Sequence, residues 1–134
     1  MQDRPSSAEL LEALAELLED EVLPSVEGPL RYRTLVGLNL TRIVEREIRL
    51  SPAQLSGERA RLVALLGEQP VPGPVSDQVF DLNARLEARL RSQGAVDDPA
   101  FTADLLEALE ATAREKLAVC RPGYDDYDPA TEVG

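Results

Sequence analysis

The stretch LRYRTLVGLNLTRIVEREI, residues 30–48, decides the fold, because its apolar side chains recur at helical spacing. Four side chains form the centre of the apolar face: Tyr32, Val36, Leu40 and Ile43. Asn39 falls on one flank of this face, Gly37 falls on the other, and Glu47 falls almost in line with its centre. The stretch therefore predicts a helix that packs on a core and carries polar side chains at or beside the packed face.

These polar side chains need partners if the face is buried. An unpaired buried amide or carboxylate costs about 1–3 kcal/mol or more, so we expect Asn39 to be at least partly buried and hydrogen-bonded. Glu47 is expected to pair with Arg46, with Arg33 or with a helix start. Gly37 costs about 0.5–1 kcal/mol relative to alanine in a helix, which close approach by another backbone would offset. Two interpretations remain open: an internal polar link that fixes helix register, or a face shared with a partner protein.

Start and stop signals place further helices on either side of this stretch. Ser6 and Glu9 form a capping box, which predicts a first helix that runs to about Leu23, just before Pro24. The apolar stripe of this helix consists of Leu10, Leu14, Leu17, Leu18 and Val22. A second helix is predicted over residues 29–50.

A second start signal follows directly. Ser51, Pro52 and Gln54 predict a third helix that ends at Gly67. The Pro- and Gly-rich segment 67–76 predicts an extended connector.

Two more helices are predicted after the connector. Residues 77–93 form the fourth, with Gly94 as its stop, and Asp98 caps the fifth. The inward side chains of the fourth helix are Val79, Leu82, Leu86 and Leu90. Those of the fifth are Phe101, Leu105, Leu109, Ala113 and Leu117.

The sequence therefore predicts an all-α protein, a single-domain bundle of about five helices that are mainly antiparallel. The bundle domain is expected over residues 1–121. The acidic segment 122–134 is expected to fray or be disordered. No segment alternates apolar and polar residues as a half-buried strand would.

Composition excludes several functions. The 134 residues carry a formal net charge of -11, which would repel a phosphate backbone and makes nucleic acid an unsuitable partner. The chain has no histidine, so Ser-His-Asp and Cys-His catalysis, His-ligated zinc and the Glu-x-x-His di-iron pattern are all excluded. Cys120 is the one cysteine, and we interpret it as a small core residue near a helix end.

Targeting signals are also lacking. No apolar run approaches the ~20 residues that span a bilayer, and residues 1–10 lack the pattern of a signal peptide. We expect a cytoplasmic protein with no membrane contact.

Charged side chains offer two candidate sites. Helical carboxylate pairs could hold Mg²⁺ if they converge on a cleft, but they fall opposite the apolar stripes and so predict a solvated face: Glu16, Glu19, Asp104 and Glu107. Arginines on two helices could grip a phosphate, although interleaved glutamates favour surface pairing: Arg42, Arg46, Arg49, Arg85, Arg89 and Arg91.

Two segments carry a family resemblance: QDRPSSAELLEALAELLEDEVLPSVEGPLRYRTLVGLNLTRIVERE, residues 2–47, and REKLAVCRPGY, residues 114–124. They resemble a bacterial family of small acidic helical proteins, classed as a domain of unknown function. The residues that match its motifs are Arg31, Tyr32, Asn39, Glu47 and Lys116. The segment after Tyr124 departs from the family pattern.

The resemblance implies a function. Members of that family are typically encoded beside kinases similar to aminoglycoside phosphotransferases and beside acyl-CoA dehydrogenases. This implies a non-catalytic accessory subunit, without a cofactor, of a kinase that acts on hydroxyacyl-CoA in acid catabolism.

Two alternatives stay open: a Mg²⁺-dependent nucleotide or CoA-ester hydrolase that uses the acidic pairs, and a structural homodimer joined through the second helix. The candidate structural or interface residues are Arg31, Tyr32, Gly37, Asn39, Arg46, Glu47 and Lys116.

Overall fold

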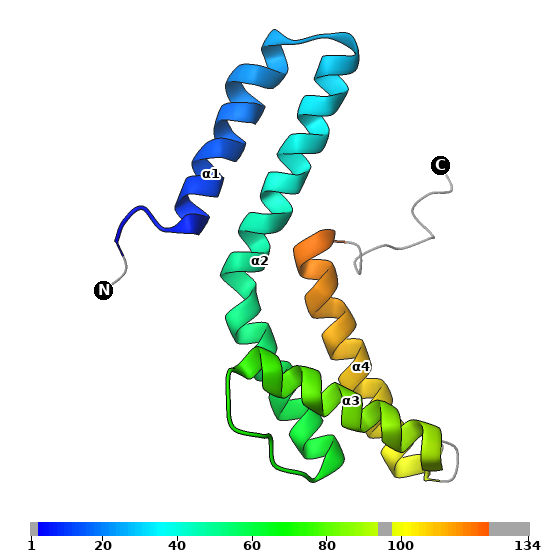
Figure 1. Cartoon of the computed structure of the whole chain (residues 1–134). Helices are drawn as coiled ribbons and strands as arrows, with labels where there is room; N and C mark the ends of the chain where they lie inside the picture. The colour runs from blue at the N-terminus through cyan, green and yellow to red at the C-terminus, as the bar shows by residue number, and fades with distance from the viewer. Residues whose placement is uncertain (1–2, 94–97, 124–134) are drawn as a thin grey trace, which may run out of the picture. The chain divides into compact units, whose positions relative to one another are not determined.

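A computed structural model describes residues 3–93 and 98–123 and contains four α-helices (Figure 1). They are α1 (Ser7–Leu17), α2 (Gly28–Leu66), α3 (Val75–Gln93) and α4 (Pro99–Cys120). A π-helical turn, Leu18–Val22, and a 3-10 turn, Leu23–Ser25, continue α1. The described residues include no strand, so the all-α prediction is confirmed. The predicted acidic tail lies almost wholly outside the described residues.

The helix count was predicted wrongly, because the expected second and third helices are one helix. α2 continues through Pro52, although proline has no N–H to offer the carbonyl of Ile48 one turn earlier. A Ser-Pro pair suits a helix start, but proline can also be accommodated inside a long helix. The chain divides into two compact units at this point, with Ser51 the last residue of one and Pro52 the first of the other. The Ser51–Pro52 pair therefore marks the point at which α2 leaves one compact unit and enters the other.

Of the described residues, 3–51 and 118–122 belong to unit 1. In it α1 and the first half of α2 lie side by side as a helical hairpin (Figure 1). The predicted capping box is confirmed: Glu9 Oε2 accepts a hydrogen bond of 2.6 Å from the N–H of Ser6, and Ser6 Oγ accepts one of 3.3 Å from the N–H of Glu9. The buried side chains of unit 1 are Ala15, Leu38 and Val119.

The predicted inward stripe of α1 is wrong in part. Leu10, Leu14 and Leu17 are exposed, whereas Ala15 is buried and Leu18 is half-buried. The helix has apolar side chains around much of its circumference, and a hairpin of two helices covers only one side of each. The small side chain of Ala15 allows α2 to approach that side closely.

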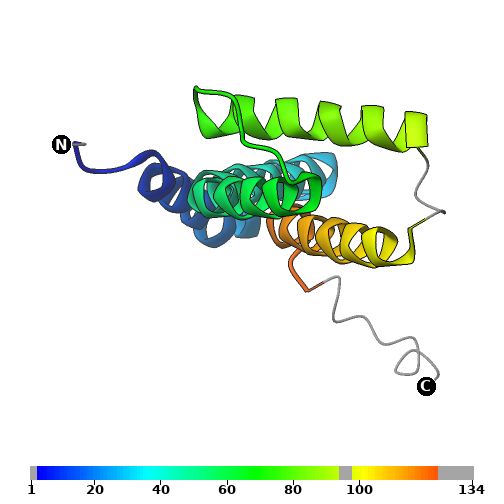
Figure 2. The same cartoon turned by 90° about the horizontal axis from the view of Figure 1, so that it is seen from below.

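Of the described residues, 52–93, 98–117 and 123 belong to unit 2. Its helices are the second half of α2 together with α3 and α4 (Figure 2), and all three contribute side chains to its core. The core side chains are Leu62 from α2, Val79, Leu82 and Leu86 from α3, and Phe101 and Leu105 from α4. This confirms the predicted inward stripe of α3 and the first half of the stripe of α4. Asp98 caps α4 as predicted, because its Oδ1 accepts hydrogen bonds of 3.1 Å from the N–H groups of Ala100 and Phe101.

A buried glutamine fastens the connector before α3. Gln78 Nε2 donates a hydrogen bond of 2.7 Å to the carbonyl of Val71, and Gln78 Oε1 accepts one of 2.9 Å from Arg59. The connector has no helical turn between Glu68 and Pro74, as its proline content predicts. Gln78 thus ties this irregular segment to α2 and α3.

Candidate functional site

Unit 1 leaves an apolar surface uncovered. Large apolar side chains are exposed on both helices of the hairpin: Leu10, Leu14, Leu17, Val36, Leu40, Val44 and Ile48. Large apolar side chains that gather at the surface of a protein can mark an interaction site. We therefore treat this surface as the first candidate site.

The opposite side of the hairpin is charged. Glu12 Oε2 lies 3.0 Å from Arg49 Nη2, and Glu19 pairs with Arg42. Helical spacing places Leu14 and Val44 about 200° around their helices from Glu12 and Arg42, so these two apolar side chains lie on the other side of the helix pair. Leu17 and Leu40 lie about 200° from the buried Ala15 and Leu38, so each of them points away from the partner helix.

The charged side does not form a metal centre. It borders a polar groove of about 300 Å³, lined by Glu12, Ala15, Glu16, Glu19, Asp20, Arg42 and Glu45. Arg42 and Arg49 form ion pairs with several of these carboxylates. The negative charge of Glu45 is the main cause that raises the pKa of Arg49. Across residues 3–93 and 98–123, no group of three or more carboxylate or cysteine side chains could hold a metal ion.

The predicted acidic pairs belong to different units. Glu16 and Glu19 lie on unit 1, and Asp104 and Glu107 lie on unit 2. All four side chains are exposed, as the helical wheel predicts.

The predictions for Asn39 and Glu47 are wrong. Both side chains are exposed, and neither makes a hydrogen bond or ion pair with any residue that the structure describes. The physical reason is that the side of α2 that packs on α1 is centred on Leu38. Glu47 lies on an uncovered side of α2, and Asn39 lines a shallow pocket that leaves its side chain exposed. No buried polar group exists there to be satisfied.

Gly37 also lacks the expected neighbour. A Cβ built at Gly37 would meet no atom within 4 Å, so no other part of the described chain approaches this backbone closely. Gly37 therefore leaves this part of the surface of α2 without a side chain.

Arg46 has a structural contact within unit 1. Its Nε donates a hydrogen bond of 2.8 Å to the carbonyl of Val119, which caps the end of α4. A shallow pocket of about 410 Å³ adjoins this contact and is lined by Asn39, Arg42, Ile43, Arg46, Cys120, Arg121 and Pro122. Because Arg42 and Arg46 are engaged with Glu19 and Val119, these arginines do not make a ready phosphate site.

Cys120 was predicted to be a core residue, and this is wrong. Its side chain is exposed, whereas the preceding residue, Val119, is buried. One residue of helix corresponds to a rotation of about 100°, so only one of the two can face inward at the end of α4.

Arg31 and Tyr32 lie at the start of α2. Arg31 Nη1 donates a hydrogen bond of 2.8 Å to the carbonyl of Leu23 and so ties α2 to the 3-10 turn. Tyr32 is exposed. Arg31 is thus a structural residue of the hairpin turn.

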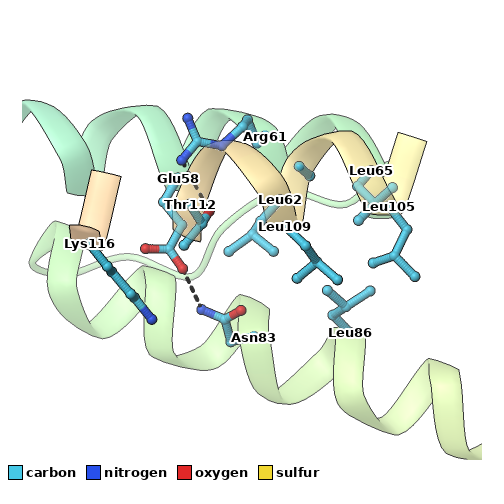
Figure 3. Close-up of a pocket in the computed structure, with 11 residues that line it drawn as sticks. Glu58, Arg61, Leu62, Leu65, Asn83, Leu86, Leu105, Leu109, Thr112 and Lys116 are labelled. Carbon is cyan, nitrogen blue, oxygen red and sulfur yellow. Dashed lines mark hydrogen bonds between the residues drawn. The ribbon is translucent and has the colours of Figure 1, made fainter. Parts of the chain in front are cut away.

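Unit 2 contains a small pocket between its helices (Figure 3). Its volume is about 180 Å³, and leucines line it: Leu62, Leu65, Leu86, Leu105 and Leu109. Polar side chains also line it: Glu58, Arg61, Asn83, Thr112 and Lys116. This volume is below the ~300–1,000 Å³ of typical ligand sites.

Most of the polar side chains that line this pocket are paired with one another. Glu58 Oε1 accepts a hydrogen bond of 3.0 Å from Asn83 (Figure 3). Arg61 forms a salt bridge of 2.6 Å with Glu115 and donates a hydrogen bond of 3.1 Å to Thr112. Lys116 makes no contact of this kind with any described residue. These pairs connect the helices of unit 2 beside its core. They leave few unpaired polar side chains that could bind a ligand.

The remaining predicted arginines are engaged in pairing, as expected. Arg85 bonds to Glu68 at 3.2 Å and to Asp81 at 2.6 Å, and Arg91 pairs with Glu87. The guanidinium carbon of Arg89 lies 3.9 Å from the centre of the Phe101 ring, a cation–π contact.

One exposed feature of α2 escaped sequence reasoning. Arg33, Leu40 and Glu47 follow one another at intervals of seven residues, a spacing that keeps all three on one side of the helix. The sequence shows this spacing, but it does not show whether that side is covered by another part of the chain. The structure shows all three side chains exposed.

The fold and its surfaces define an all-α protein of two helical units with exposed apolar side chains on both helices of unit 1. None of the described helices is both long and apolar enough to span a membrane. The chain belongs to the family described as Domain of unknown function (DUF6285), whose profile matches residues 24–124 and so includes all of α2, α3 and α4. No curated protein and no solved structure matches the chain.

Proposed function

We propose that this protein is a non-catalytic accessory subunit of a kinase similar to aminoglycoside phosphotransferases, acting on hydroxyacyl-CoA in acid catabolism. A cytoplasmic location is part of this proposal. The choice of partner rests on the sequence resemblance carried by segments 2–47 and 114–124. The subunit itself would bind neither cofactor nor metal.

The observation that carries the proposal is the large amount of apolar surface that the chain's own fold leaves uncovered. In unit 2 the side chain of Phe80 is 79% exposed, and Leu106 is also exposed. Exposed aromatic side chains are frequent anchors of protein interfaces. Phe80 is therefore our candidate anchor for the kinase.

The proposal also agrees with the arrangement of the carboxylate side chains that the structure describes. A phosphotransferase needs a phosphate-binding loop, Mg²⁺ ligands and a catalytic aspartate in one site, and the described carboxylates do not gather into such a site. The same lack of convergence weighs against the Mg²⁺-dependent hydrolase.

Co-purification tests the proposal. The kinase and this chain are expressed together, and the rate of the kinase is measured with and without the chain. We expect a complex and a change in rate. Phe80→Ala should weaken the complex about tenfold or more, whereas Ser92→Ala, an exposed change near the far end of α3, should have no effect. If no complex forms and the rate does not change, the proposal is wrong.

A further inference from the structure

α2 carries an exposed stripe of side chains whose order is self-complementary. The stripe consists of Arg33, Val36, Leu40, Val44 and Glu47, and we call it the α2 stripe. The spacings along it are three, four, four and three residues, which keep all of its members on one helical face. Each of them is exposed, and Leu40 at the centre is 59% exposed.

We propose that the α2 stripe binds the α2 stripe of a second copy of the chain, with the two helices antiparallel and a two-fold axis passing beside Leu40. In this register Leu40 meets Leu40 of the second copy. Val36 meets Val44 of the second copy, and Arg33 meets its Glu47. Each contact occurs twice except the one on the axis, as a symmetric interface requires.

The charges of the stripe favour a second copy over an unrelated protein. Arg33 and Glu47 form no ion pair or hydrogen bond with the rest of the described chain. Each lies seven residues from Leu40, which is about 10.5 Å along a helix. A reversed copy therefore presents a glutamate where this chain presents an arginine, and the reverse.

The same charges exclude the parallel arrangement. Two parallel stripes in register would place Arg33 against Arg33 and Glu47 against Glu47, and like charges at such positions are destabilising. The net charge of -11 makes two copies repel each other. The stripe adds nothing to this repulsion, because its one positive and one negative charge sum to zero. The antiparallel pairing is the one that satisfies every member of the stripe.

The surface beside the stripe is low at Gly37. Paired helices lie about 8–10 Å apart, and Gly37, next to Val36, has open space where a side chain would stand. The stripe is about 21 Å long, a small contact by the standards of stable interfaces. We therefore expect a dimer that forms at micromolar concentration.

Charge reversal tests the pairing with the purified full chain alone, so the result does not depend on the kinase. Sedimentation should show a dimer of the wild type. Arg33→Glu and Glu47→Arg should each weaken it by about tenfold, because each change converts attraction into repulsion twice per dimer. A mixture of the two single variants should form heterodimers, and the double variant Arg33→Glu/Glu47→Arg should regain the wild-type affinity.

Cysteine crosslinking tests the register. In a Cys120→Ser background, Leu40→Cys should give a disulfide-linked dimer on mild oxidation, because the two residues meet on the axis. Val44→Cys is the matched control: the two copies of residue 44 would be about 12 Å apart along the helices, beyond the reach of a disulfide. Helix content, measured by circular dichroism, should be unchanged in both variants.

Several results would overturn the inference. A monomer at all concentrations up to ~200 µM contradicts the expected micromolar contact. Equal crosslinking of Leu40→Cys and Val44→Cys, or no heterodimer in the mixture of charge variants, would show that the stripes do not pair in this register. None of these results would bear on whether the kinase binds elsewhere.

Discussion

The Nε–H of Arg46 donates a hydrogen bond of 2.8 Å to the main-chain carbonyl of Val119, so a side chain of α2 caps the last turn of α4. The two residues are 73 positions apart in the sequence. The last carbonyl groups of a helix have no partner within it, and an arginine supplies both a donor and a positive charge at the negative end of the helix dipole. The contact holds residues 118–122, the second segment of unit 1, against the part of α2 that belongs to its first segment.

We expect Arg46→Ala to loosen the end of α4. The loss should be about 1 kcal/mol, because a hydrogen bond from a charged group is removed from a partly exposed site. Amide hydrogen exchange in the last turn of α4 should become faster, while exchange in α3 should not change. Glu16→Ala, an exposed change on α1, is the control. Equal exchange in wild type and Arg46→Ala would show that the contact does not stabilise this turn.

Leu82 is the most completely buried side chain of the core of unit 2, with 0% exposure. Leu82→Ala should therefore leave a cavity and lower the free energy of unfolding by about 2–5 kcal/mol. Urea unfolding measures the loss, and Ala84→Ser on the exposed side of α3 should change it by less than about 0.5 kcal/mol. A loss below about 1 kcal/mol for Leu82→Ala would contradict the described core.

Sequence patterns predict the helices and the core of unit 2 well. Ser6 and Asp98 are recognisable caps, and both are confirmed. The spacing of Val79, Leu82 and Leu86 identifies the buried side of α3 correctly.

The same patterns are less informative in unit 1. Helical spacing measures how apolar residues are distributed around a helix, but it does not identify what covers them. Leu14 and Leu40 have the spacing of core residues and are nevertheless exposed, because a hairpin of two helices buries one side of each helix only. The predictions for Asn39 and Glu47 fail for a related reason, since both assumed burial and both side chains are exposed.

Gln78 is a buried polar residue with two different partners, the carbonyl of Val71 and the guanidinium of Arg59. Gln78→Ala should cost about 2 kcal/mol, because both groups lose a hydrogen bond. Gln78→Glu retains the acceptor for Arg59 but removes the donor to Val71, so it should release the connector without removing the contact to α2. Limited proteolysis within residues 67–74 should therefore be faster in both variants, and faster than in Ser76→Ala. No change in cleavage would show that Gln78 does not hold the connector.

Pro52 lies inside α2, where it offers no N–H to the carbonyl of Ile48 and its ring crowds the preceding turn. Replacing it with alanine should restore that hydrogen bond and stabilise the protein by about 1–3 kcal/mol, less the entropy that proline removes from the unfolded chain. Pro29 stands in the first turn of α2, where a missing N–H costs little, so Pro29→Ala is the matched control and should have no stabilising effect. Thermal unfolding of the two variants distinguishes the cases. If Pro52→Ala does not raise Tm above that of Pro29→Ala, then Pro52 begins a separate helix and α2 does not continue through it.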